Sequence, residues 1–130
     1  MVHRTVKAFH FRRWLPLLLW MAAIFFMSNQ PSEALPVYGP WDWFVKKGGH
    51  FLAYALLAGL AFRATREGAR PYLTAFLIAF AYAVSDEIHQ LFVDGRHGTA
   101  VDVMIDSLGA FTALLLIYWR SAEVFVPFKN

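Results

Sequence analysis

Residues 14–27 read WLPLLLWMAAIFFM, an apolar run with no charged side chain. Arg12 and Arg13 stand directly before it, and Ser28-Asn29-Gln30-Pro31 follows it. A helix that is apolar on every side is typical of a segment surrounded by lipid. A cleaved signal peptide can begin in the same way, but the residues after the run offer no small-x-small cleavage motif. We therefore expect a retained membrane helix.

Three further apolar segments follow along the chain, separated by short stretches that break helices. A loop with three prolines and several aromatic residues comes first, then a basic turn near Gly68, then a polar loop with Gly95 and Gly98. The predicted spans lie at about 14–28, 46–63, 72–92 and 100–119. The predicted fold is an all-α membrane protein, a four-transmembrane-helix bundle that forms one domain over residues 1–130.

The basic residues predict the orientation, because lysine and arginine collect on the cytoplasmic side of a membrane. With the N-terminus inside, nine of the twelve basic residues are cytoplasmic: Arg4, Lys7, Arg12, Arg13, Arg63, Arg66, Arg70, Arg120 and Lys129. The three on the outside are Lys46, Lys47 and Arg96. An even number of spans then places both termini in the cytoplasm.

Composition narrows the class of function. Hydrophobic residues make up 58% of the 130 residues and charged residues only 16%, which is more apolar surface than a small soluble domain can bury. The chain has no cysteine, so disulfides, iron–sulfur clusters and thiolate catalysis are excluded. The basic residues are spread over the loops, so we expect no nucleic-acid partner.

Ionisable residues within the predicted spans gather toward the outer side. The second span carries His50 and Tyr54, spaced i, i+4 on one helix face. Further polar residues occupy the end of the third span, the loop after it and the start of the fourth span: Asp86, Glu87, His89, Gln90, Arg96, Asp102 and Asp106. At a rise of about 1.5 Å per residue, the three spans bring these groups to a similar depth, so we expect one cluster.

Carboxylates at membrane depth are costly, about 2.5–3.5 kcal/mol each near the bilayer centre on insertion scales. They should therefore face the interior of the bundle or a wet cavity, where histidine, arginine or a bound cation can pair with them. A divalent metal such as Zn²⁺ or Mn²⁺ could be held by His50, Asp86, His89 and Asp102, although their spacing matches no established metal motif.

Three stretches resemble the VanZ-like family of small bacterial membrane proteins. They are Lys47-Gly-Gly-His50-Phe-Leu-Ala-Tyr54, then Tyr82-Ala-Val-Ser-Asp86-Glu87-Ile-His89-Gln90-Leu-Phe, and then Gly95-Arg96-His-Gly-Thr-Ala-Val-Asp102-Val-Met-Ile-Asp106-Ser-Leu-Gly109. The resemblance implies a multi-pass protein of the bacterial cytoplasmic (inner) membrane, in the cell envelope. The founding member is associated with reduced susceptibility to the lipoglycopeptide teicoplanin. Family members often carry Asn at the position of Asp106, so a charged or merely polar role stays open for that residue.

Three functions remain open. The first is binding of, or action on, an anionic group at the outer leaflet: a membrane lipid, a lipid-linked cell-wall precursor or a lipoglycopeptide. His50, Tyr54, Gln90, Arg96, Asp102 and Asp106 would then contact the ligand. The second is a membrane-embedded, metal-dependent hydrolase or phosphotransferase with Asp86, Glu87 and His89 as candidate catalytic residues. The third is a structural or accessory protein whose polar cluster only fixes the geometry of the bundle.

Overall fold

The computed structural model describes residues 2–123, with side chains from residue 11 onward. The described chain contains four α-helices, α1 (Val2–Ser28), α2 (Asp42–Thr65), α3 (Pro71–Gln90) and α4 (Ala100–Glu123). Two short 3₁₀ helices, η1 (Ser32–Ala34) and η2 (Gly39–Trp41), lie in the connection between α1 and α2, and residues 2–123 include no strand. The all-α fold class predicted from the sequence is confirmed. Lys129, one of the predicted cytoplasmic charges, lies outside the described residues.

The helix boundaries follow from local sequence. Pro71 begins α3 at a position where proline costs no helical hydrogen bond, and Pro31, Pro36 and Pro40 keep the α1–α2 connection out of a long helix. α2 begins at Asp42, four residues before the predicted start of the second span, and α3 ends at Gln90, two residues before the predicted end of the third.

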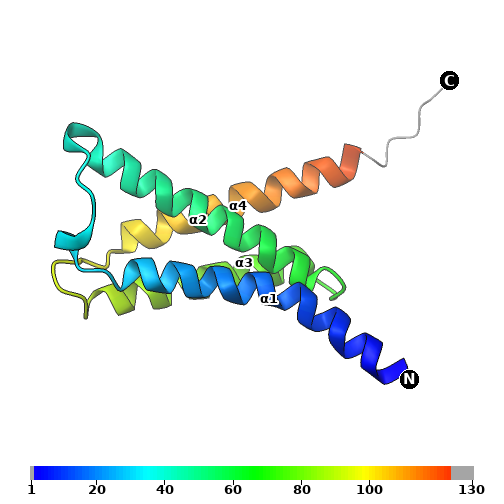
Figure 1. Ribbon diagram of the computed structural model, residues 1–130. Coiled ribbons are helices and arrows are strands. Elements are labelled where there is room, and N and C mark those ends of the chain that lie inside the picture. The colour runs from blue at the N-terminus through cyan, green and yellow to red at the C-terminus, as the bar shows by residue number, and fades with distance from the viewer. Residues whose placement is uncertain (1, 124–130) are drawn as a thin grey trace.

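α2 packs against each of the other three helices, and α1 also contacts α3. Figure 1 shows α2 crossing α4, and α1 running along α3. The connections 29–41 and 91–99 lie together at one end of the molecule, which we call the polar end. The first turns of α1 and the last turns of α4 both lie toward the opposite side of the view.

Small residues make the close packing possible. Ala75, Ala79 and Ala83 form the buried stripe of α3, spaced four residues apart. On α4, a Cβ added to Gly109 would overlap the backbone carbonyl of Phe51 on α2. Such contacts let two helix backbones approach, as is common where helices pack without a driving force from water.

Two aromatic side chains tie α1 to its neighbours. Trp20 donates from Nε1 to the backbone oxygen of Ala53 on α2, at 2.9 Å. The Tyr82 hydroxyl of α3 donates to the backbone oxygen of Met21, at 2.6 Å. Both donors are half-buried, so these bonds fix how α1 lies against α2 and α3.

Two of the four helices are long and apolar enough to cross a membrane, judged by length and composition. They are α1, over Phe11–Ser28, and α4, over Ala100–Glu123. Large apolar side chains also cover the outer surface of the bundle, among them Leu18 and Leu19 on α1 and Phe111 and Leu116 on α4, each more than half exposed. Apolar surface of this extent is typical of a face that meets a membrane or another protein.

Candidate functional site

Five polar side chains of the polar end, on α3 and α4, point into the bundle. Asp86, Glu87, Gln90, Asp102 and Asp106 are each at most 6% exposed. They lie on the last two turns of α3 and the first two turns of α4. The structure therefore brings the polar residues of these two helix ends together, as the sequence predicted. The neighbouring residues on the same turns, such as Ile88 and Met104, face outward.

His50 of α2 and Asp106 of α4 form a buried pair. The His50 Nδ1 atom lies 3.2 Å from Oδ1 of Asp106, and Asp106 is 0% exposed. Neither Asp106 oxygen, Oδ1 or Oδ2, has a hydrogen-bond partner among the described residues. Gly109 lies one turn further along α4, and its close approach to Phe51 is what brings Asp106 within reach of His50.

Glu87 is held by the loop before α4. Its Oε2 accepts a hydrogen bond from the Thr99 backbone amide at 2.9 Å, and its Oε1 lies 3.4 Å from Nε2 of Gln90. Gly98 makes this possible, because a Cβ at that position would overlap the backbone carbonyl of Glu87.

Asp86 reaches toward α1. Its Oδ2 accepts from the Ser28 hydroxyl at 2.8 Å and from Gln90 Nε2 at 3.4 Å. Its Oδ1 has no hydrogen-bond partner among the described residues, although the residue is only 3% exposed. A buried ionised carboxylate with a free oxygen is costly unless a positive charge compensates it.

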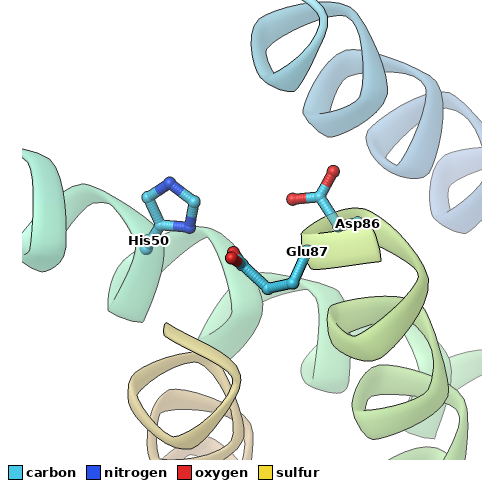
Figure 2. A group of neighbouring side chains, drawn as sticks. All are labelled: His50, Asp86 and Glu87. Carbon is cyan, nitrogen blue, oxygen red and sulfur yellow. The ribbon is translucent and has the colours of Figure 1, made fainter. Parts of the chain in front are cut away.

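One histidine and two carboxylates converge on a single point. Ligand atoms of His50, Asp86 and Glu87 all lie within 4.8 Å of one another. Figure 2 shows the Glu87 carboxylate beside the His50 ring, and one oxygen of Asp86 turned toward both. The structure therefore brings together two of the four residues in the sequence-derived metal set, His50 and Asp86, with Glu87 as the third.

The other two members of that set have different partners. The His89 Nε2 atom lies 3.1 Å from Oδ1 of Asn29, and its ring packs on Phe25 with the centroids 4.6 Å apart. Asp102 pairs with Lys47 through Oδ1 and accepts from the Thr99 hydroxyl through Oδ2 at 2.8 Å. Neither belongs to the group of converging ligand atoms.

Tyr54 lies one turn after His50 and is completely buried. Its hydroxyl has no hydrogen-bond partner within residues 11–123, and its ring centroid is 6.3 Å from that of Tyr82. A buried hydroxyl without a partner in the core of a bundle is uncommon, so this one is available to a bound group.

Arg96 holds the end of α1. Its Nε donates to the backbone oxygen of Gln30 at 3.1 Å, and its Nη2 donates to that of Met27 at 2.9 Å. These carbonyls lie at a helix C-terminus, where a cation is favourable. The sequence gave no indication of these two carbonyl partners.

Two cavities open at the polar end. The first, about 440 Å³, lies between α1 and α2, and its apolar lining includes Ile24, Met27, Pro36, Val45 and Ala53. The second, about 250 Å³, has a more charged lining that includes Asp42, Lys47, His97 and Asp102. Four residues line both cavities, Leu35, Lys46, His50 and Arg96, so an apolar space and a charged space adjoin.

Sequence reasoning missed three residues of this site. Ser28 stood at the end of the first predicted span, Lys47 counted only as a basic residue of the outer side, and Thr99 belonged to a stretch of the family resemblance. Each contacts a carboxylate: Ser28 binds Asp86, and the Thr99 amide binds Glu87. A polar residue at the last position of an apolar helix was the available signal for Ser28. The pairing of Lys47 with Asp102 depends on how α2 and α4 cross.

The VanZ/LLP1 family model matches residues 11–121 of this chain. This match includes every residue of the polar end described above. Comparison with curated proteins and with solved structures found no match.

Proposed function

This chain belongs to the VanZ/LLP1 family, and from that premise we propose that it is a multi-pass protein of the bacterial cytoplasmic membrane. In this proposal all four helices cross the bilayer, both termini are cytoplasmic and the polar end faces outward. α1 and α4 already have the length and composition of membrane helices.

The lengths and surfaces of α2 and α3 support four spans. They contain 24 and 20 residues, which correspond to about 36 and 30 Å at 1.5 Å per residue, enough for the hydrocarbon core. Their outward side chains are apolar, including Leu52 and Leu56 on α2 and Leu73 and Leu77 on α3. Asp86 and Glu87, near the end of α3, are buried, as expected for intramembrane ionisable residues.

We further propose that the polar end binds a molecule with a lipid tail and an anionic head group, taken from the outer leaflet. The observation that carries this proposal is the junction of the two cavities. An apolar space between α1 and α2 suits a tail, and it opens beside Lys46 and Arg96, which suit a phosphate or carboxylate. A ligand with both parts would use both spaces at once.

Three kinds of molecule share this chemistry: an anionic phospholipid, a lipid-linked cell-wall precursor, and a lipoglycopeptide of the teicoplanin type. They differ in head group, so binding can tell them apart. The purified protein in a neutral detergent should gain thermal stability with the true ligand, because binding to the folded state alone stabilises it. Phosphatidylglycerol, undecaprenyl phosphate and teicoplanin are the three probes, and phosphatidylcholine is the neutral reference.

Matched variants on α1 and α2 test where the ligand binds. Ala23 lines the apolar cavity, whereas Ala22 is exposed beside it and does not line it. We expect Ala23→Trp to abolish the stabilisation by the ligand and Ala22→Trp to retain it. Lys46→Gln should weaken binding of the anionic probe more than Arg120→Gln, at the far end of α4. Equal stabilisation by all probes, or equal loss in both tryptophan variants, would refute the proposal.

A second candidate function is a metal-dependent hydrolase or phosphotransferase acting on the same lipid head group. The convergence of His50, Asp86 and Glu87 favours it. Mass spectrometry of the probe lipid after incubation with the protein distinguishes the two functions, because an enzyme releases or transfers the head group and a binding protein leaves it intact. If no probe binds and none is converted, the polar cluster serves only the architecture of the bundle.

A further inference from the structure

The point where α2 and α3 meet gathers three groups of the kinds that bind metals. His50 offers an imidazole nitrogen, and Asp86 and Glu87 each offer a carboxylate oxygen, all within 4.8 Å of one another. Figure 2 shows the three side chains directed toward a shared space from two helices. Helices hold ligands more rigidly than loops do, so this arrangement is set by the packing of the bundle.

A second observation comes from the hydrogen bonds of Asp86. The residue is 3% exposed, and its Oδ2 is occupied by Ser28 and Gln90. Its Oδ1 has no hydrogen-bond partner among the described residues. The oxygen turned toward His50 and Glu87 in Figure 2 is on the side away from α1, which carries Ser28. A buried carboxylate oxygen aimed at a histidine and a second carboxylate lacks the positive charge that it needs.

The charges around the point leave a negative surplus. Glu87 is 5% exposed, and Asp106, which contacts His50, is 0% exposed and has an unpartnered Oδ2. The cationic side chains that line the two cavities have other partners: Lys46 pairs with Asp42, Lys47 pairs with Asp102, and Arg96 binds backbone carbonyls of α1. Three buried carboxylates therefore share one histidine.

We propose that His50, Asp86 and Glu87 bind a divalent transition-metal ion, Zn²⁺ or Mn²⁺. One nitrogen and two carboxylate ligands favour such ions over Mg²⁺ and Ca²⁺, which bind to oxygen ligands. Asp106, whose Oδ1 lies 3.2 Å from Nδ1 of His50, adds negative charge next to the metal. His89 and Asp102 are not ligands.

Three protein ligands leave room for at least one more ligand on the ion, as in metal sites that bind substrate. His50 also lines both cavities, so the proposed metal site adjoins them. The metal site is independent of the proposed lipid, and its test requires no lipid.

The test uses the full-length protein, purified in detergent through a tag without histidine, stripped with a chelator and reloaded with Zn²⁺, Mn²⁺ or Mg²⁺. Elemental analysis after dialysis should give one equivalent of Zn²⁺ or Mn²⁺ and much less Mg²⁺. Loading with Co²⁺ adds a spectroscopic readout, because a bound Co²⁺ absorbs in the visible range. Absence of stoichiometric Zn²⁺ and Mn²⁺ from the reloaded protein would overturn the proposal.

Variants identify the ligands. His50→Gln, Asp86→Asn and Glu87→Gln should each weaken metal binding at least tenfold and abolish the Co²⁺ absorption. Asp94→Asn, an exposed acidic control in the loop after α3, and His89→Gln should retain both metal binding and the Co²⁺ absorption.

Thermal unfolding without metal, measured for each variant, distinguishes the loss of a metal ligand from the loss of the fold. If a ligand variant unfolds, the addition of Zn²⁺ should stabilise the wild type, Asp94→Asn and His89→Gln, and none of the three ligand variants. Equal metal binding by all folded variants, or loss of binding in Asp94→Asn, would contradict the assignment.

Discussion

His50 on α2 and Asp106 on α4 face each other across the interface of these two helices, with Nδ1 of His50 3.2 Å from Oδ1 of the fully buried Asp106. The residues that flank His50 and Asp106 in the sequence give no indication that the two side chains meet. The contact places an ionisable couple beside Asp86 and Glu87, and it lets α4 influence a site whose converging ligand atoms come from α2 and α3.

The effect of an Asp106 substitution on the stability of the protein should therefore depend on whether the new side chain is polar. We expect Asp106→Asn to keep the fold, since an amide oxygen can still lie against Nδ1 of His50. Asp106→Leu should destabilise the protein by about 1–3 kcal/mol, because His50 loses its buried partner. Thermal unfolding in one detergent measures both. Ser107→Ala is the control, because the Ser107 hydroxyl bonds only within α4, to Val103. A leucine variant as stable as the wild type would show that the pair contributes nothing.

Gly109 should tolerate no side chain. A Cβ at Gly109 would overlap the Phe51 carbonyl, so Gly109→Ala must separate α2 from α4 at a cost of about 1–3 kcal/mol. Gly59 lies on α2 with nothing within 4 Å of an added Cβ, so Gly59→Ala should be neutral or stabilising. Chemical or thermal unfolding of the two alanine variants compares them directly. Equal stability would mean that the two helix backbones do not approach as described.

Arg96 should matter through its shape as well as its charge. Its guanidinium donates to the carbonyls of Met27 and Gln30 together. We expect Arg96→Ala to cost about 1.5–3 kcal/mol, the range for hydrogen bonds to charged groups, and Arg96→Lys to recover only part of it. Thermal unfolding and protein level in membranes are the measurements, with exposed Arg63→Ala as the control. Full recovery by lysine would show that charge alone suffices.

The orientation of the chain can be read with reporter fusions. We expect fusions at Glu67 and after Glu123 to report a cytoplasmic location, and a fusion at Gly39 to report an external one. The reason is the excess of basic residues in the segments assigned to the inside, nine against three. An external signal at Glu67 would reverse the orientation and place the polar end, with its proposed ligand site, on the cytoplasmic side.

The all-helical fold and the gathering of polar residues at one end followed from the sequence. Apolar runs of helical length, separated by proline and glycine, leave few alternatives to helices. Ionisable residues also cannot face an apolar exterior, so Asp86, Asp102 and Asp106 had to turn inward. Family membership followed from the run Asp86-Glu87-Ile-His89-Gln90 and the glycine-flanked Arg96, and the family match over residues 11–121 confirms it.

The partners of individual side chains were decided only by the tertiary structure. His89 and Glu87 lie two residues apart on α3, yet Glu87 joins His50 whereas His89 turns to Asn29. Asp102 binds Lys47, and Asp106, one turn later, contacts His50. Which face of a helix meets which neighbour depends on the crossing of α2 with α4, and that crossing depends on the close approach of Gly109 to Phe51. Periodicity gives the spacing of residues along one helix, but only packing between helices determines which residues meet.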